Sequence, residues 1–196
     1  MEERVFAAVE RLLGEGLRYT EISVQRIITE AGLARSTFYA HFRDKSELLA
    51  RQAASLNESL FDAAAWDPTA VDALPALVRA FEDVLRRHRE HRVLLAAITE
   101  TAAYDPAVND FYTADLDAFE SRAVEYLRMC QSAGLTDPDI EPAAASLIVV
   151  VGGYQAIVRH IATDPGSGDA AFARQLAEIW WYGVYRRRPE GVDRAG

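Results

Sequence analysis

The sequence predicts an all-α protein of about nine helices, with a small N-terminal domain and a larger C-terminal helical domain. Apolar residues recur every three or four positions along nearly the whole chain, which is the period of helices that bury one face. Residues that favour turns separate the long segments, at Gly16, Gly32, Pro68, Pro106 and Gly134. No stretch keeps the polar–apolar alternation of a half-buried strand.

Four helices are expected in the first third of the chain, at residues 2–15, 23–31, 35–42 and 44–65. Ser23 is a good N-cap for the second, and Gly32 follows it where a left-handed C-cap is expected. Asp44 and Glu47 form a variant capping box at the start of the fourth, with Asp as the cap.

Five more helices are expected, at residues 70–89, 92–103, 106–133, 141–162 and 168–187. The domain boundary is placed within the fourth helix, which gives domains at residues 1–50 and 51–196. The segment Ala143–Val158 carries no charge but is shorter than the roughly 20 apolar residues of a membrane span. We therefore expect a helix buried on several sides, in a cytoplasmic protein with no membrane partner. Cys130 is the only cysteine, which excludes an intramolecular disulfide and a cysteine-based zinc site.

Charge is distributed unevenly along the chain. The net charge is −9, which argues against a protein that coats nucleic acid. Residues 1–51 hold 8 Lys and Arg against 8 Asp and Glu, so the whole excess of acid lies in residues 52–196. DNA is therefore expected to be tolerated only at the N-terminal end.

The segment from Ser23 to Phe42 predicts a helix-turn-helix, with two short helices joined by a turn that contains glycine. At about 100° per residue, Phe38 and Phe42 of the second helix lie on one side and face the core. Small or hydroxyl-bearing side chains lie opposite or beside them, which suits a major groove. These residues are Ser36, Thr37, Tyr39 and Ala40.

This segment resembles the TetR family of transcriptional regulators. Residues 4–50 carry the likeness, above all AGLARSTFYAHFRDKSELL, with an alanine-glycine turn, a Thr-hydrophobe-Tyr triplet, a His-Phe pair and a Lys at the start of the next helix. The ending EIWWYGVY resembles, more weakly, the EthR-like subgroup. One departure is Ala34, where the family usually has Ser or a similar cap. The lack of a capping side chain at this position should weaken the following helix by about 1 kcal/mol.

The resemblance implies a set of DNA contacts. Thr37, Tyr39 and Lys45 would bind phosphates, Lys45 together with the amides at the start of its helix. Base edges would be faced by Arg35, Ser36 and Ala40, and Ser23 and Gln25 would approach from the preceding helix. For His41 two alternatives stand, a partly buried ring and a contact with DNA.

The resemblance also implies a ligand pocket and a dimer interface in the C-terminal domain. The pocket is expected to be mainly apolar with few polar anchors. Its candidate residues are Trp66, Phe81, Thr99, Phe111, Tyr112, Ala114, Ala118, Phe119, Tyr154, Gln155 and Trp180. Glycines inside an apolar helix indicate the close approach of another backbone, as in a two-fold dimer. The interface candidates are Leu147, Val151, Gly152, Gly153, Ile157, Phe172, Leu176, Ile179 and Gly183.

These features favour a ligand-responsive regulator, usually a repressor in this family, that binds a palindromic operator as a homodimer. No cofactor or metal is expected. His88 and His91 have a spacing that could hold a metal, but their charged neighbours favour a solvated face instead. An enzyme is disfavoured because no nucleophile–His–acid set or glycine-rich phosphate loop stands out. A helical ligand-binding or adaptor protein with a vestigial DNA-binding face is the alternative from another class.

Overall fold

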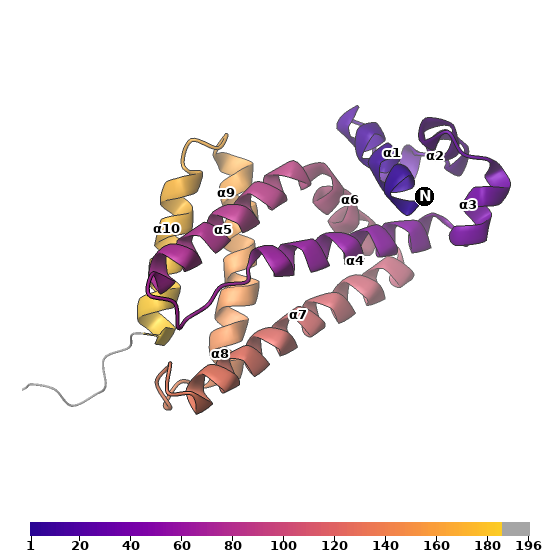
Figure 1. The fold of residues 1–196 in the computed structure, drawn as a ribbon. Coiled ribbons are helices and arrows are strands. Elements are labelled where there is room, and N and C mark those ends of the chain that lie inside the picture. Colours follow the sequence, from indigo (N-terminus) through magenta and orange to yellow (C-terminus); the bar gives the residue numbers. More distant parts are fainter. Residues whose placement is uncertain (186–196) are drawn as a thin grey trace, which may run out of the picture. The chain divides into compact units, whose positions relative to one another are not determined.

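The computed structural model describes residues 1–185, with every side chain except those of residues 115 and 116. All regular structure in this part is helical, which confirms the predicted class (Figure 1). The elements of the first third are α1 (Glu2–Gly14), a 3-10 turn η1 (Tyr19–Glu21), α2 (Val24–Ala31), α3 (Arg35–His41) and α4 (Lys45–Ala63). Those that follow are α5 (Ala73–Glu90), α6 (Arg92–Ala102), α7 (Pro106–Ser132), α8 (Pro142–Leu147), α9 (Gly153–Thr163) and α10 (Asp169–Trp180).

Two short π-helical turns extend this pattern. One, η2 (Ile148–Gly152), joins α8 to α9 in a single helix, and the other, η3 (Trp181–Tyr185), continues α10. The helix expected at residues 141–162 is therefore present, with a local irregularity that ends beside Gly153. The last expected helix is present as far as Tyr185, and its final two residues lie outside the described part of the chain.

The chain forms two compact units. The first unit comprises Met1–Ser59 and Glu90–Leu116, and the second comprises Leu60–Arg89 and the described residues from Asp117 on. The segment that contains α6 thus returns to the N-terminal helices. Both α4 and α7 contribute residues to each unit.

The core of the first unit is built by the apolar stripes that the sequence indicates. α1 contacts both α2 and α6, and buries Val5, Val9 and Leu12 almost completely. From α3 and its end, Phe38 and Phe42 are fully buried. The Phe42 ring lies 6.4 Å from the ring of Phe6, so an aromatic contact joins the end of α3 to α1.

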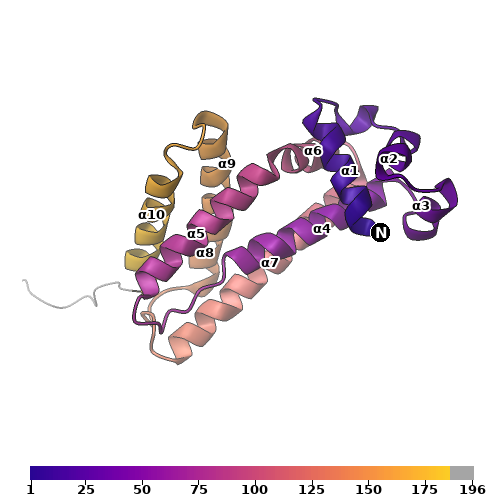
Figure 2. The ribbon, with the colours of Figure 1, turned by 45° about the horizontal axis from the view of Figure 1, so that its top comes forward.

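The core of the second unit consists of two clusters of apolar side chains. One joins α5, α7 and the end of α10, with Leu77, Leu127 and Trp181 among its buried members. The other joins α5, α9 and α10 through Leu85, Ile157 and Ala173. Figures 1 and 2 both show α5, α9 and α10 lying together.

The helix Pro142–Thr163 corrects one expectation. Only 11% of its most apolar window is buried, although burial on several sides was expected. Ser146 and Ile157 are its buried residues, at 1% and 4% exposure. By length and by its mean hydropathy of 1.4 this helix could also cross a membrane, a property that it shares with core helices of soluble proteins. Its apolar surface is therefore available for contacts outside the single chain.

Candidate DNA-binding interface

Three features fix the two ends of α2 in the helix-turn-helix. Ser23 Oγ accepts a hydrogen bond from the Arg26 backbone N–H at 3.2 Å, which confirms the predicted N-cap of α2. Gly32 has φ of 63°, the left-handed conformation that glycine adopts most easily. The guanidinium of Arg4 donates to the Ala31 carbonyl at 2.7 Å, which ties α1 to the end of α2.

Helix α3 begins at Arg35 without a side-chain cap. Ala34 occupies the N-cap position in an extended conformation, with φ of −77° and ψ of 148°, and offers no acceptor. The helix is held instead by the burial of Phe38, at 0% exposure. The helix therefore forms without a side-chain cap.

The outer face of α3 presents the residues that the resemblance implicates. Arg35, Ser36, Ala40 and His41 are exposed, and Tyr39 is 45% exposed. Exposure of His41 rules against the alternative of a partly buried ring. Thr37 is partly buried, so its hydroxyl lies at the edge of this face. The Arg35 guanidinium carbon lies 5.2 Å from the centroid of the Tyr39 ring, a cation–π contact that orients both side chains.

The two candidates on the preceding helix lie at its first turn. Ser23 and Gln25 are both exposed, but the Ser23 hydroxyl already accepts the capping hydrogen bond. Gln25 Nε2 lies 3.5 Å from Thr29 Oγ1 on its own helix, a distance too long to immobilise the amide.

The start of α4 carries the predicted variant capping box. Asp44 Oδ1 accepts from the Glu47 backbone N–H at 2.8 Å, and Glu47 Oε2 accepts from the Arg43 backbone N–H at 2.8 Å. The Glu47 N–H holds the pKa of the Asp44 carboxyl below its usual value. The Arg43 N–H, followed by the Arg51 side chain, does the same for the pKa of Glu47. Both carboxylates therefore stay charged where they stabilise the helix start.

Lys45 makes contacts that sequence reasoning missed. Its Nζ donates to the backbone carbonyls of Tyr19 at 2.7 Å and of Ile22 at 2.8 Å. Burial lowers the pKa of this ammonium. Conversely Arg43, which was not singled out, has 76% of its side chain exposed. The charge of Arg43 beside the family-like His-Phe pair was the signal that could have drawn attention to it.

The predicted pocket residues fall in both units. In the first unit, Phe111 and Tyr112 are partly buried, whereas Ala114 and Thr99 are exposed. The Thr99 hydroxyl donates to the Leu95 carbonyl of its own helix at 2.9 Å, so its proton is already used in a hydrogen bond within α6.

In the second unit the predicted pocket residues are mostly aromatic and partly buried. Trp66, Phe81 and Trp180 pack against the first apolar cluster, and the rings of Trp66 and Tyr185 lie 4.9 Å apart. The Phe119 ring meets Phe61 edge-on at 5.1 Å. Tyr154 is partly buried, while Ala118 and Gln155 are exposed.

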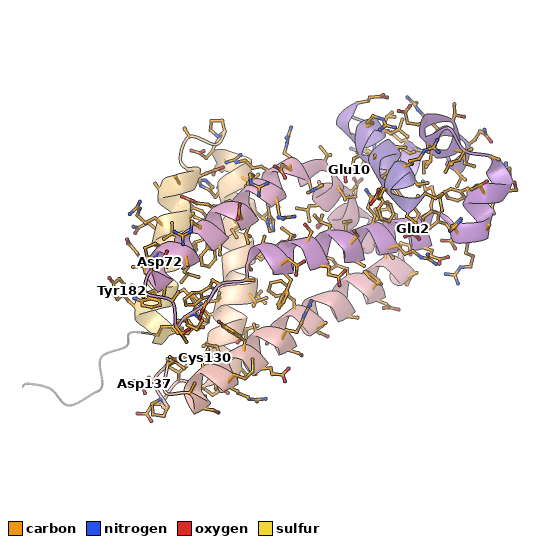
Figure 3. All side chains as sticks on the ribbon, in the orientation of Figure 1. Glu2, Glu10, Asp72, Cys130, Asp137 and Tyr182 are labelled. Carbon is orange, nitrogen blue, oxygen red and sulfur yellow. The ribbon has the colours of Figure 1, made fainter. Side chains whose placement is uncertain are left out.

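The predicted interface residues divide into two groups. Leu147, Val151 and Ile179 are 48%, 42% and 70% exposed, and Gly152 and Gly183 are exposed with them. Ile157 instead lies in the second apolar cluster, against which Phe172 and Leu176 also pack, so these three side chains support the chain's own core. Further exposed apolar residues that the sequence did not single out are Ile148, Val158 and Tyr182, the last labelled in Figure 3.

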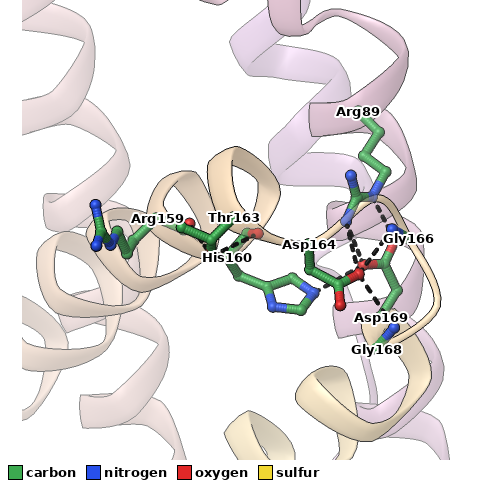
Figure 4. Close-up of polar contacts among 8 residues, drawn as sticks. All are labelled: Arg89, Arg159, His160, Thr163, Asp164, Gly166, Gly168 and Asp169. Atoms are coloured by element: carbon green, nitrogen blue, oxygen red, sulfur yellow. Dashed lines mark hydrogen bonds and ion pairs between the residues drawn. The ribbon is translucent and has the colours of Figure 1, made fainter.

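A polar network joins the end of α5 to α9 and α10 (Figure 4). Arg89 Nε and Nη2 donate to the two carboxylate oxygens of Asp169, each at 2.6 Å, and His160 Nε2 lies 2.8 Å from Asp169 Oδ1. Asp164 completes a group whose candidate metal-binding atoms lie within 4.8 Å of one another. The guanidinium among these carboxylates favours an ion-pair network over a cation site.

The other candidate metal pair is not supported. His88 is buried, which corrects the expectation of a solvated face, and its Nδ1 lies 2.8 Å from the Val84 carbonyl. His91 Nδ1 lies 3.3 Å from Glu10 Oε2.

Comparison with known proteins shows what this part of the chain and the whole chain are similar to. Residues 18–51 match the family model of bacterial regulatory proteins, tetR family. The HTH-type transcriptional regulator EthR of Mycolicibacterium smegmatis is 26% identical over 97% of this chain and 89% of its own. Among solved structures, GusR of Salmonella enterica has a TM-score of 0.75 at 19% identity, over 94% of this chain and 95% of its own. A putative regulator from Saccharomonospora viridis in complex with choline has a TM-score of 0.66 at 18% identity, over 93% and 96%.

Proposed function

We propose that this chain, a member of the TetR family of transcriptional regulators, is a cytoplasmic homodimeric repressor that leaves its operator when a small lipophilic molecule binds. DNA-binding regulation follows from the family, which is not one of enzymes. The observation that carries the proposal is the exposed polar face of α3, set opposite the fully buried Phe38. A short helix that is anchored by one face and polar on the other fits into the major groove of DNA.

The contacts with DNA are assigned to α2 and α3. Tyr39 and Thr37 bind phosphates, and Arg35, Ser36, Ala40 and His41 face base edges. Ser23 and Gln25 approach the backbone at the first turn of α2. The Arg35–Tyr39 contact holds the guanidinium in place before binding, which lowers the entropic cost of recognition.

The homodimer is assigned to the exposed apolar residues of the helix Pro142–Thr163 and of the α10 segment. Support comes from Ile148 and Ile179, large apolar side chains that are each 70% exposed in the single chain. At Gly152, Gly153 and Gly183 an added Cβ would meet no atom within 4 Å, so the fold of the single chain does not require glycine there. Close approach of a second copy gives these glycines a role.

The ligand is expected to bind in the C-terminal part of the chain, among the predicted pocket residues. The partly buried aromatic side chains of the second unit, among them Trp66, Phe81 and Phe119, support an apolar molecule. The net charge of −9 favours a neutral or cationic ligand over an anion. Choline, with which the Saccharomonospora viridis protein is in complex, matches this charge preference but is not lipophilic.

Selection from random duplex DNA tests the regulatory function. We expect enrichment of a two-fold symmetric site with half-sites about 34 Å apart or a multiple of this distance. Substitution of Ser36 should change the preferred sequence, whereas Tyr39→Phe should weaken all sequences alike. Enrichment of no symmetric site would favour the adaptor, the alternative from another class.

The ligand response is tested by release of the selected operator across a panel of lipophilic compounds. Ala118→Trp adds a large side chain to α7 in the second unit, at a position that is exposed in the single chain. If Ala118 borders the ligand, this variant loses the response while it stays folded. If it releases DNA at the parent's ligand concentration, this part of the pocket assignment fails.

A further inference from the structure

The side chain of Lys45 is committed to the protein itself. Its Nζ donates to the carbonyls of Tyr19 and Ile22, with the carbonyl of Thr20 at 3.5 Å. The same atom lies 4.8 Å from the centroid of the Tyr19 ring. An ammonium has three N–H donors, and the carbonyls of Tyr19 and Ile22, in and just after η1, receive two of them at short distances.

Tyr19 also donates a hydrogen bond to Lys45. Its hydroxyl donates to the Lys45 carbonyl at 2.7 Å, and the residue is only 3% exposed. Burial raises the pKa of this phenol, so the hydroxyl stays a donor at any physiological pH. We call this reciprocal pair of residues, Tyr19 and Lys45, the clasp. It joins the connection between α1 and α2 to the first residue of α4.

A phosphate contact by Lys45 would require the clasp to open. Two carbonyls and a half-buried charge would then lose their partners, and such groups are costly to leave unsatisfied. The clasp also fixes the angle at which α4 leaves the helix-turn-helix, because it holds the chain on both sides of α2 and α3.

Arg43 is free of these constraints. Its side chain is 76% exposed, and its Nε lies 3.2 Å from Asp44 Oδ2 at the surface. Its backbone N–H is fixed by Glu47 at 2.8 Å, so the residue is well positioned although its side chain extends into solvent. A guanidinium has five N–H donors in a geometry that suits phosphate oxygens.

We propose that Lys45 positions the helix-turn-helix through the clasp and that Arg43 binds the operator phosphate at the start of α4. The assignment of Arg43 rests on the proposed DNA-binding function. The assignment of Lys45 rests on contacts within the chain and can be judged without DNA.

The experiment measures thermal unfolding and the salt dependence of operator binding for the parent protein, Arg43→Gln, Lys45→Met and Lys45→Arg. The slope of log K against log salt changes by about 0.9 per phosphate contact, and by twice that in a dimer. Arg43→Gln should reduce the steepness of the slope by this amount and keep the parent melting temperature. Lys45→Met should melt at a lower temperature and keep the parent slope.

Lys45→Arg separates the two roles of Lys45. It keeps the positive charge that a phosphate contact needs, but its longer side chain and planar guanidinium do not fit the space in which one nitrogen atom donates to two carbonyls. The clasp therefore predicts a lower melting temperature for this variant, with the parent slope. A parent-like melting temperature in both Lys45 variants overturns the clasp, and a parent-like slope in Arg43→Gln overturns the phosphate contact. Absence of any sequence-specific binding by the parent would overturn the proposed function and the role of Arg43, while the melting data would still decide on the clasp.

Discussion

The helix-turn-helix and the helix Pro142–Thr163 are both rich in apolar residues, but they use them differently. In the first, Phe38 and Phe42 are fully buried within the N-terminal helices, and the Phe42 ring meets that of Phe6. In the second, most of the apolar window lies at the surface of the single chain. A locally completed core can be recognised from a short motif, whereas an apolar surface that needs a second molecule looks like core in sequence alone.

The largest effect is expected where the local core is broken. Phe38→Ala removes a fully buried ring and should lower the free energy of unfolding by about 3–5 kcal/mol. Urea denaturation followed by circular dichroism measures this loss. Tyr39→Ala is the matched control, because that neighbouring ring is 45% exposed and should cost much less. Equal losses in both variants would show that α3 is not anchored by Phe38.

A weaker effect should follow from crowding the apolar surface. Gly153→Leu needs no backbone change for its Cβ, which would meet no atom within 4 Å outside its own helix backbone. Overpacking against a second copy should weaken self-association by about 1–3 kcal/mol, or roughly 5- to 150-fold. Sedimentation equilibrium measures this change.

Ala162→Leu is the control for that experiment. It adds the same side chain to α9 nine residues later, on the opposite side of the helix at about 100° per residue. Ala162 is exposed, so this variant should fold and dimerise like the parent. A parent-like dimer in Gly153→Leu would move the interface away from this glycine.

The polar network at the end of α5 should make the stability of the second unit depend on pH through Asp169. The Arg89 side chain, followed by His160, holds the pKa of the Asp169 carboxyl below its usual value. A carboxyl with a lowered folded-state pKa contributes stability above its unfolded value, near 4, and loses it as pH falls through the folded value. Asp169→Asn should therefore cost roughly 1.5 kcal/mol at pH 7, with a smaller difference from the parent as the pH falls below 4.

Asp72→Asn is the control for the Asp169 variant. Asp72 pairs with Arg79 at the surface, where both side chains are 59% exposed, and exposed pairs contribute little. Its unfolding curve should match that of the parent at both pH values. A pH-independent difference between Asp169→Asn and the parent would mean that packing, and not charge, is what the substitution disturbs.

The sequence predicted most features that depend on neighbouring residues, and fewer of the contacts between residues far apart in the chain. The caps at Ser23, Gly32 and Asp44 follow from neighbouring residues, as does the orientation of Phe38, and all four are present. The clasp joins residues 26 positions apart, and no periodicity indicates such a contact. The burial of Ile157 and the exposure of Ile179 depend on the packing of α5, α9 and α10, which composition does not specify.

The smallest expected effect concerns the one imperfect cap of the helix-turn-helix. Ala34 already has the extended conformation of an N-cap residue, so Ala34→Ser needs no backbone change to place its hydroxyl oxygen near the N–H groups of Ser36 and Thr37. At present the Thr37 N–H reaches the Ala34 carbonyl at 3.0 Å. The new acceptor should raise the free energy of unfolding by about 0.5–1 kcal/mol, whereas Ser23→Ala, which removes the existing cap of α2, should lower it by a similar amount. Chemical denaturation of both variants beside the parent measures the two changes with opposite signs. A loss of stability in Ala34→Ser would mean that the start of α3 is set by the burial of Phe38 in a geometry that leaves the hydroxyl without a donor.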